Sequence, residues 1–414
     1  MSMQLTIEQF RLSQELDQLG SISEAPPPVV TRVVFTDADV RGREFVKSLC
    51  REAGLSIRDD PAGNTSARWQ GSDPGLAPVG TGSHIDAIPN AGRFDGTVGV
   101  LGGLEAIRAL QRAGFRPKRS IELVIFTSEE PTRFGIGCLG SRLLSGLLDP
   151  SAGESLKDRD GISLNQARAS AGFTGSLATV ALPRGYYSAF AELHIEQGPL
   201  LEQRQVPLGV VTAIAAPASL KIQIEGEGGH AGAVLMPGRH DAFLAAAEIA
   251  LAVESAALST GSIDTVGTVG VCDVFPGAVN SIPSRVRIEV DVRDIDQPRR
   301  DAVLRQIAEA CDKTAAKRHV KIHSEMVNAD PPAQCDPIVV NALVQACETH
   351  KIRFERMISR AYHDSLFMSR IAPTAMLFVP SRGGVSHRPD EYSSPEAIAQ
   401  GVLVLAEALS RLSS

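Results

Sequence analysis

The sequence predicts an α/β protein with a mainly parallel sheet and a smaller α+β module inserted into it. Three observations predict this. From residue 1 to about 214, apolar strand-like runs alternate with helical stretches, as in parallel sheets with a functional site at the strand ends. Residues 215–330 follow the order βαββαβ, which is typical of a ferredoxin-like module. Residues 331–414 carry His387, which belongs chemically with residues of the first segment, so this part is expected to fold back onto residues 1–214.

Each segment has recognisable elements. In the first, the strand-like runs are VGTGSHID, IELVIFTSEE and YYSAFAELHIEQ, and a helix is expected over 98–113. In the middle segment, the alternating strand SLKIQIEG precedes a helix that opens at Asp241. Then come TVGTVGVCDVF, SRVRIEVDVRD, a helix over 297–316 and a strand near 320–328. After the proline-rich DPPAQCDP, the last segment contains a helix, the strand TAMLFVP, the His387 loop and a helix from Pro395.

Bulk properties indicate a soluble enzyme of the cytoplasm. The 414 residues include 41 basic and 48 acidic side chains, for a net charge of −7, and no long basic run occurs, which argues against a nucleic-acid partner. Six cysteines are scattered without CxxC spacing, which fits reduced thiols. The N-terminal residues lack the apolar stretch of a signal peptide, and no membrane span is expected.

Six residues read together as a site for two divalent metal ions that activate water. They are His84, Asp95, Glu129, Glu130, His194 and His387. Each lies in a segment that fits a strand end or a loop. Asp95 stands among glycines ahead of a helix, where its carboxylate could bridge two ions.

The local spacing supports this interpretation. Asp86 lies two residues after His84, so its carboxylate could orient the imidazole and leave one ring nitrogen for metal. Glu129 and Glu130 end an apolar run, and on an extended chain their side chains point to opposite sides. One could bind metal while the other faces the substrate.

Each feature also has an ordinary structural interpretation. A single histidine at a strand end is often a hydrogen-bonded structural residue, adjacent acids are often solvated, and Asp95 could be a turn residue. The joint occurrence favours metal, because acids that close a hydrophobic strand are costly to bury without a counter-charge.

Several long motifs resemble the amidase, hydantoinase and carbamoylase branch of the dinuclear aminoacylase-type metallohydrolases. They are HID, RFDG, SEEPTRFG, LHIEQGP, GGHAGAVLMPGR and SHRPDEYSS. The resemblance covers nearly the whole chain. It implies a metal-dependent exopeptidase-like catalytic domain, formed by residues 1–214 and 331–414, and an inserted lid and dimerisation domain formed by residues 215–330.

The resemblance also implies roles for individual residues of the metal site. Asp95 would bridge the ions, His84 and His194 would complete one site, Glu130 and His387 would complete the other, and Glu129 would be the general base. His230, in GGHAG, would reach the active site of the partner subunit of a homodimer and stabilise the oxyanion. The alternatives for His230 are a turn histidine or part of a phosphate-cradling loop, although GEGGHAG lacks the lysine of a P-loop.

The expected substrate-binding residues are Gln197, Asn280, Arg293, Tyr362 and His363. The guanidinium of Arg293 suits a substrate carboxylate, although an ion pair with neighbouring Asp291 or Asp294 would look the same in sequence. Tyr362 is expected to recognise a hydroxyl-bearing substrate.

Stretches such as LGVVTAIAAPASLK and MISRAYHDSLFMSRI are most similar to branch members that act on (S)-ureidoglycolate. The expected reaction is hydrolysis of its ureido C–N bond, giving glyoxylate, ammonia and carbon dioxide. N-carbamoyl-L-amino-acid hydrolysis and allantoate hydrolysis stay open, as does a non-catalytic binding protein on the same fold. The expected ions are two Mn²⁺, with Zn²⁺, Co²⁺ or Ni²⁺ as alternatives.

Overall fold

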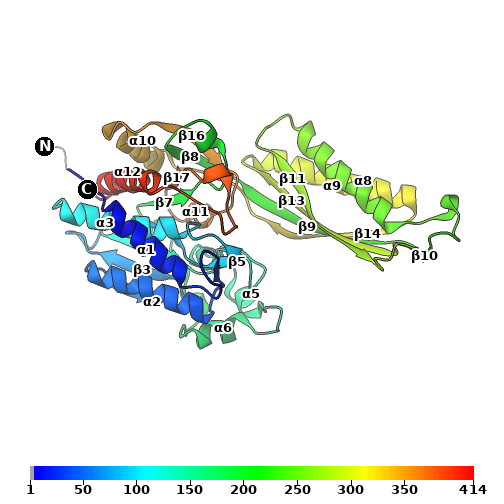
Figure 1. The fold of residues 1–414 in the computed structure, drawn as a ribbon, viewed down its shortest axis with the longest axis horizontal. Coiled ribbons are helices and arrows are strands. Elements are labelled where there is room, and N and C mark those ends of the chain that lie inside the picture. Colours follow the sequence, from blue (N-terminus) through cyan, green and yellow to red (C-terminus); the bar gives the residue numbers. More distant parts are fainter. Residues whose placement is uncertain (1–3) are drawn as a thin grey trace. The chain divides into compact units, whose positions relative to one another are not determined.

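A computed structural model describes residues 4–414, which form two compact units (Figure 1). The first unit contains the chain up to Thr212 together with Cys335–Ser359 and His363–Ser414. The second contains Ala213–Gln334 and the short stretch Arg360–Tyr362.

A nine-stranded sheet runs in the order β15-β8-β17-β7-β4-β6-β3-β2, and β16 also pairs with β8. Its centre is parallel: β17 (Thr374–Val379), β7 (Ala189–Ile195), β4 (Val79–His84) and β6 (Ile121–Phe126). The flanking strands are antiparallel, which the sequence did not reveal. They are β2 (Ser56–Asp59), β3 (Thr65–Trp69), β8 (Leu208–Ile214) and β15 (Ala333–Gln334), while β16, which pairs with β8, spans Phe354–Ser359.

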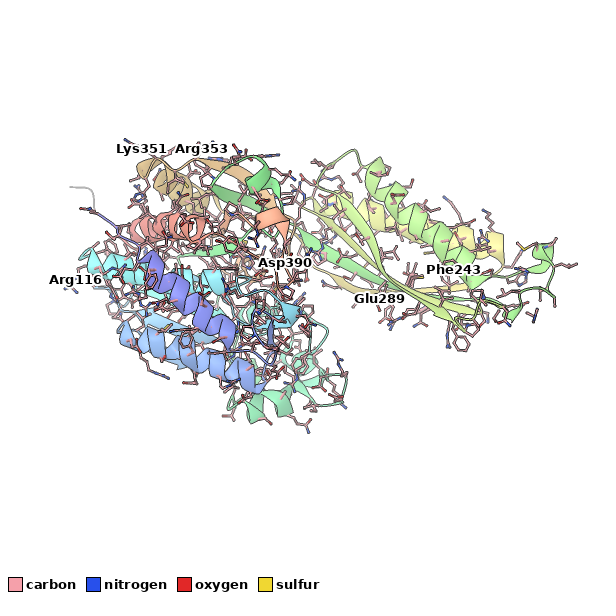
Figure 2. The ribbon with its side chains drawn as sticks, viewed as in Figure 1. Arg116, Phe243, Glu289, Lys351, Arg353 and Asp390 are labelled. Atoms are coloured by element: carbon pink, nitrogen blue, oxygen red, sulfur yellow. The ribbon has the colours of Figure 1, made fainter. Side chains whose placement is uncertain are left out.

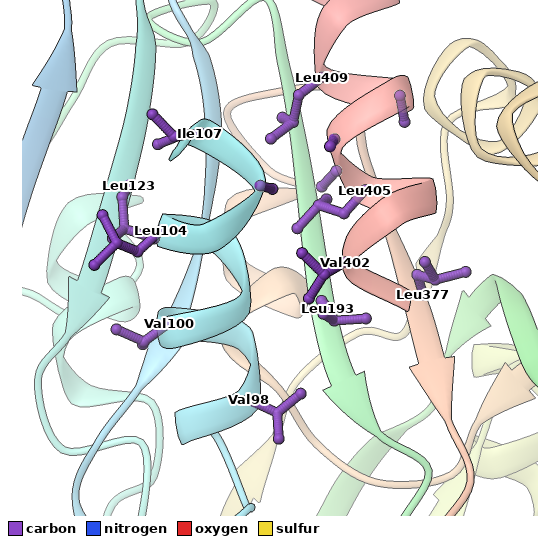
Figure 3. Packing of buried hydrophobic residues seen from close by; sticks show 14 of the residues in the cluster. Val98, Val100, Leu104, Ile107, Leu123, Leu193, Leu377, Val402, Leu405 and Leu409 are labelled. Carbon is purple, nitrogen blue, oxygen red and sulfur yellow. The ribbon is translucent and has the colours of Figure 1, made fainter. Parts of the chain in front are cut away.

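Both faces of the parallel strands are buried, because alternate residues enter two different apolar cores. In β6, Leu123 and Ile125 belong to one core, and Val124 and Phe126 to the other. The first core is covered by α1 (Gln9–Ser21), α2 (Asp37–Glu52), α3 (Thr97–Arg112), α10 (Pro337–Thr349) and α12 (Pro395–Ser413). Figure 3 shows α3 and α12 in this core beside β7.

The second core of this unit packs under shorter helices. These are α4 (Leu139–Leu144), α6 (Leu164–Ser170) and α11 (Asp364–Met368). The unit also contains α5 (Pro150–Ser155), α7 (Leu200–Gln203) and a two-stranded pair, β1 (Val30–Arg32) with β5 (Ala87–Ala91). The metal-set residues therefore sit on a frame packed from both sides.

The second unit has a four-stranded antiparallel sheet in the order β11-β13-β9-β14. Its strands are β9 (Ala216–Glu225), β11 (Val266–Phe275), β13 (Arg285–Asp294) and β14 (Lys321–Ala329). Helices α8 (Ala242–Ser259) and α9 (Gln297–Arg318) complete the expected βαββαβ order and share an apolar core with the sheet. A short pair, β10 (Gly229–His230) with β12 (Ser281–Ile282), carries His230.

Two helix starts in the second unit follow from capping side chains. The Asp241 carboxylate accepts hydrogen bonds from the amides of Phe243 and Leu244, and Asp296 caps α9 in the same way. By length and composition alone, α8 is apolar enough to cross a membrane, and its buried face forms part of the core of this unit. The predicted fold class is thus confirmed.

Candidate metal centre

The carboxyl ends of the parallel strands bring the predicted metal set together within the first unit. His84 is the last residue of β4, and His194 is the next-to-last residue of β7. Glu129 and Glu130 follow β6, and His387 lies in the loop after β17. Asp95 comes just before α3, where Gly96 adopts φ +66°. This is the sheet edge at which α/β proteins place ligands.

The two oxygens of Asp95 face different partners. Oδ1 lies 3.7 Å from His84 Nε2 and 3.3 Å from His194 Nε2. Oδ2 lies 3.2 Å from His387 Nε2, which is 3.1 Å from Glu130 Oε1. Two groups of potential ligands therefore share one carboxylate: His84, Asp95 and His194 form one, and Asp95, Glu130 and His387 form the other. This is the arrangement that a bridging carboxylate needs.

Main-chain carbonyls fix the tautomers of two histidines. His84 Nδ1 lies 3.0 Å from the backbone oxygen of Asp86, and His194 Nδ1 lies 2.9 Å from that of Ile195. A carbonyl oxygen only accepts, so each Nδ1 carries a proton, and Nε2 is the ring nitrogen that faces Asp95. The buried Nε2 of His194 has no hydrogen-bond partner and faces a carboxylate. A cation between them would satisfy both groups, so this donor set fits a divalent metal.

The centre concentrates negative charge in the protein interior. Asp86, Asp95, Glu129 and Glu130 are all buried. Burial raises the pKa of Glu129 well above its usual value, and the charge of Glu130 adds to this while His84 opposes it. Burial also acts to raise the pKa of Asp95, but the neighbouring rings of His194, His387 and His84 hold it well below its usual range. Asp95 thus stays ionised, as a bridging ligand must.

Asp86 orients His84 through a different atom from the one expected. Its backbone oxygen contacts Nδ1, whereas its carboxylate stands 3.8 Å away. The carboxylate instead accepts hydrogen bonds from the amides of Glu129, at 3.2 Å, and Glu130, at 3.1 Å. Asp86 therefore links the end of β4 to the segment that carries both glutamates.

Three side chains hold Asp95 in place, and two of them were not singled out from the sequence. Gln197 Nε2 donates to Asp95 Oδ2 at 2.8 Å, and the hydroxyl of Ser386 donates to the same oxygen at 2.9 Å. Glu391 Oε1 accepts from the amides of Phe94 and Asp95, and Glu391 Oε2 lies 3.0 Å from the Ser386 hydroxyl. The signal available was position, since Ser386 and Glu391 share the SHRPDEYSS motif with His387.

His363 is also in the first unit, but it is buried rather than open. Its ring packs edge-on against His194 with centroids 4.5 Å apart, and its Nε2 lies 3.0 Å from the Ser359 hydroxyl. Glu192, His194 and His363 form a third group of potential ligands. His194 cannot serve it separately, because its Nε2 already faces Asp95.

Four other predicted residues belong to the second unit: His230, Asn280, Arg293 and Tyr362. The amide of Ala231, next to His230, donates to the backbone oxygen of Asn280. Arg293 forms the ion pair with Asp291 that the sequence left open, at 2.8 Å. The Tyr362 hydroxyl lies 3.0 Å from Asp330 Oδ2. The roles of these residues toward a substrate stay predictions.

An α/β fold with two ligand groups that share one carboxylate at the ends of parallel strands defines the class of exopeptidase-like metallohydrolases. The comparisons agree. The chain belongs to peptidase family M20/M25/M40, whose family model matches residues 80–411. The predicted family resemblance is thereby confirmed, and with it a hydrolase that binds divalent metal.

Named relatives fall within the predicted branch. The chain is 54% identical to ureidoglycolate hydrolase of Arabidopsis thaliana, over 99% of this chain and 87% of that protein. It is 40% identical to N-carbamoyl-L-amino acid amidohydrolase of Geobacillus stearothermophilus, over 96% and 97%. It also resembles the crystal structure of AtUAH in complex with (S)-hydroxyglycine, with a TM-score of 0.90, 53% identity and coverage of 99% and 98%.

Proposed function

We infer that the protein is a metal-dependent amidohydrolase that cleaves the ureido C–N bond of (S)-ureidoglycolate to give glyoxylate, ammonia and carbon dioxide. The observation that carries this is the 54% identity, over nearly the whole chain, to a ureidoglycolate hydrolase. The similar AtUAH has been crystallised with (S)-hydroxyglycine and with glyoxylate, which are the species expected after the ureido group has been removed. The complete ligand set disfavours a non-catalytic binding protein on this fold.

The residues of the centre fit two divalent ions, which would polarise the substrate carbonyl and make the attacking water more acidic. Asp95 would bridge them, His84 and His194 would hold one, and Glu130 and His387 the other. Glu129 would take the proton of the attacking water and deliver it to the leaving nitrogen. The released carbamate then loses carbon dioxide and ammonia, and hydroxyglycine loses a second ammonia to leave glyoxylate.

His230 is proposed to donate to the oxyanion of the tetrahedral intermediate. Its Nδ1 accepts a hydrogen bond from the Gly232 amide at 3.1 Å, so the proton resides on Nε2. His230 is exposed, which leaves that N–H available to a substrate. A donor of this kind typically contributes about 3 kcal/mol to transition-state stabilisation.

The substrate carboxylate is proposed to bind Arg293 and Asn280, while Gln197, His363 and Tyr362 line the remainder of the pocket. Arg293 would then give up its partly exposed ion pair with Asp291 and bind the substrate carboxylate instead. This is feasible because exposed ion pairs are weak. Tyr362 would recognise the substrate hydroxyl. Joints near residues 214 and 331 would let the second unit act as a lid that excludes water.

The second unit is also proposed to form a homodimer. Its helix α8 exposes large apolar side chains, namely Phe243, Leu244, Leu251 and Leu258, of which Phe243 is labelled in Figure 2. Strand β11 is an edge strand of the antiparallel sheet, with unpaired main-chain groups on its outer side. An exposed apolar helix face beside an open sheet edge is typical of a subunit interface.

A substrate panel tests the proposed reaction. Purified protein loaded with Mn²⁺ is assayed for ammonia release from (S)-ureidoglycolate, N-carbamoyl-L-amino acids and allantoate. The expected result is the highest kcat/KM for ureidoglycolate. The 40% identity to the Geobacillus enzyme favours the carbamoylase alternative. A preference for N-carbamoyl-L-amino acids would establish that alternative. A preference for allantoate would establish allantoate hydrolysis instead.

Mixed dimers test the role of His230 across the interface. His230→Ala subunits and Glu129→Gln subunits are each expected to be inactive alone and to regain part of the activity when mixed. Verified mixed dimers without any rescue would contradict this role.

Mn²⁺ is the proposed ion, with Zn²⁺, Co²⁺ and Ni²⁺ as alternatives, because histidine and carboxylate ligands accept all four. Reconstitution of metal-free protein with each ion in turn, followed by the same assay, distinguishes them. A cytoplasmic location is proposed as well, and the six free cysteines support it.

A further inference from the structure

Cys138 is a buried residue beside the proposed base that the sequence did not single out. Its Sγ lies 3.5 Å from Glu129 Oε1, and its amide donates to the Glu129 backbone oxygen at 2.8 Å. The adjoining amides of Leu139 and Gly140 donate to the backbone oxygens of Ser128 and Thr127. The segment that begins α4 is thus tied, residue by residue, to the segment that carries Glu129.

The side chain of Cys138 is a neutral donor. Burial raises the pKa of the thiol well above its usual value, and the charges of Glu129 and Asp364 raise it further. The sulfur therefore keeps its proton, and a carboxylate oxygen within reach is its natural acceptor. A separation of 3.5 Å suits a hydrogen bond that involves sulfur, because sulfur is larger than oxygen.

The two oxygens of Glu129 consequently face different groups. Oε1 faces Cys138, whereas Oε2 lies 3.7 Å from Nε2 of His84, on the side of the metal ligands. A free glutamate could exchange its oxygens by rotation about its last bond. An S–H···O bond to one of them favours a single orientation.

The environment of Cys138 differs from that of the other buried cysteines of the first unit. Cys50 and Cys347 belong to the apolar core under α3 and α12. Cys138 is fully buried but belongs to neither of the two apolar cores described above. It also adopts φ +55°, a left-handed conformation that is uncommon outside glycine and strains the backbone. Such conformations cluster at functional sites.

We propose that Cys138 is a positioning residue that orients the carboxylate of Glu129 through an S–H···O hydrogen bond and so presents Oε2 for proton transfer. The proposal rests on the proposed role of Glu129 as the base. Cys138 itself touches neither substrate nor metal in this scheme; it acts through Glu129.

The S–H stretch gives a test that is independent of activity. The difference between infrared spectra of the wild type and the Cys138→Ala variant assigns the band of Cys138. In the Glu129→Gln variant this band is expected to move to higher frequency, because an amide oxygen accepts more weakly than a carboxylate. The band of Cys347, assigned in the same way, should stay in place. An unmoved Cys138 band would overturn the proposal.

Kinetics of two Cys138 variants give the second test. Cys138→Ala, which removes the donor, should keep both ions and a KM within about twofold of wild type, while kcat falls about tenfold. The acidic limb of its kcat profile should move to higher pH, since the ionised form of Glu129 loses a donor. Cys138→Ser restores a donor and should recover most of kcat. An Ala variant with wild-type kcat, or a Ser variant as impaired as Ala, would overturn the proposal.

The experiments distinguish a failure of the proposed function from a failure of the proposed role of Cys138. Full activity of Glu129→Gln would remove the proposed base, whatever the infrared result. An inactive Glu129→Gln variant with an unmoved Cys138 band would leave the proposed function intact and remove only the role of Cys138. If Cys138→Ala does not fold, the Cys138→Ser variant assigns the same band.

Discussion

At the scale of single residues, the centre depends on strained backbone as well as on ligand chemistry. Ser128, Cys138, Gln197 and His387 all adopt positive φ values, between +53° and +58°. None is glycine, and each lies at or beside a residue of the metal centre. Because such conformations persist only where surrounding contacts hold them, their concentration here is consistent with a site selected for geometry over local stability.

Asp95 should control both ions, whereas each histidine controls one. Its two oxygens face separate ligand groups, so Asp95→Asn is expected to lose both ions, and His194→Ala only one. Elemental analysis after dialysis against buffer without added metal measures the stoichiometry. An Asp95→Asn protein that retains two ions would show that the carboxylate does not bridge.

Glu129 should affect turnover and leave metal content unchanged. Glu129→Gln keeps the shape of the side chain but removes the proton acceptor, so kcat should fall by about 10²–10⁴-fold while two ions remain bound. Steady-state kinetics with metal analysis on the same preparation check both parts. A fall in activity that merely tracks metal loss would contradict a role as base.

Metal binding should release a proton from His387. Hydrogen bonds to Asp95 and Glu130 raise its pKa to about 11 in the metal-free protein, so at pH 8 the ring is protonated, while a ligand must be neutral. The apparent affinity for metal should therefore rise about tenfold per pH unit below this pKa from this group alone. Calorimetric titration in buffers of different ionisation enthalpy measures the protons released, and a value of zero would refute this coupling.

At the scale of elements, glycine lets the start of α3 approach the ligand of a neighbouring strand. Gly96, which precedes α3, has φ +66°, and a Cβ there would stand about 2.5 Å from the ring of His84. At the other end of the helix, Gly114 has φ +73°, but nothing lies within 4 Å of the position of a Cβ. Both glycines have positive φ values, but their surroundings differ.

These glycines form a matched pair of variants. Gly96→Ala should displace His84 and weaken metal binding by at least tenfold, whereas Gly114→Ala should only destabilise the fold, by about 1 kcal/mol, through its left-handed conformation. Metal titration and denaturant unfolding of both variants separate the two effects. Equal metal affinity in the two proteins would contradict the close approach at Gly96.

At the scale of the whole molecule, the chain builds separate cores. The proposed metal ligands all belong to the first unit, while the second unit has its own core between α8, α9 and its sheet. Removal of metal should therefore speed amide hydrogen exchange in β4, β7 and the loops that follow them, and leave β9 and β13 unchanged. Exchange measured by mass spectrometry with and without chelator tests this; equal acceleration in both units would show that the two respond together.

Much of the fold and of the metal set could be predicted, because the residue types at particular positions indicate both. His84, Glu130 and His387 stand at strand ends or in loops where polar groups interrupt apolar runs, and Asp241 marks the start of α8. The antiparallel flanks of the large sheet could not be predicted, since strand direction depends on partners far away in sequence.

What the sequence could not predict is which atoms of these residues make the contacts. The pattern HID indicated that Asp86 helps His84, but it could not tell the carbonyl from the carboxylate. The contacts of Cys138, Ser386 and Glu391 depend on backbone conformation and on which face of a loop turns inward, and a linear pattern contains neither. The catalytic roles of the second-unit residues are predicted from the family resemblance, because their contacts within the second unit do not indicate a substrate.

The contacts of His84 and His194 with main-chain oxygens have a consequence for divergence among related sequences. A carbonyl is common to all amino acids, so substitution at position 195 leaves that imidazole's acceptor in place, and its Nε2 still faces Asp95. Substitutions of the neighbouring side chains can therefore change the substrate specificity while the orientation of these two rings is kept.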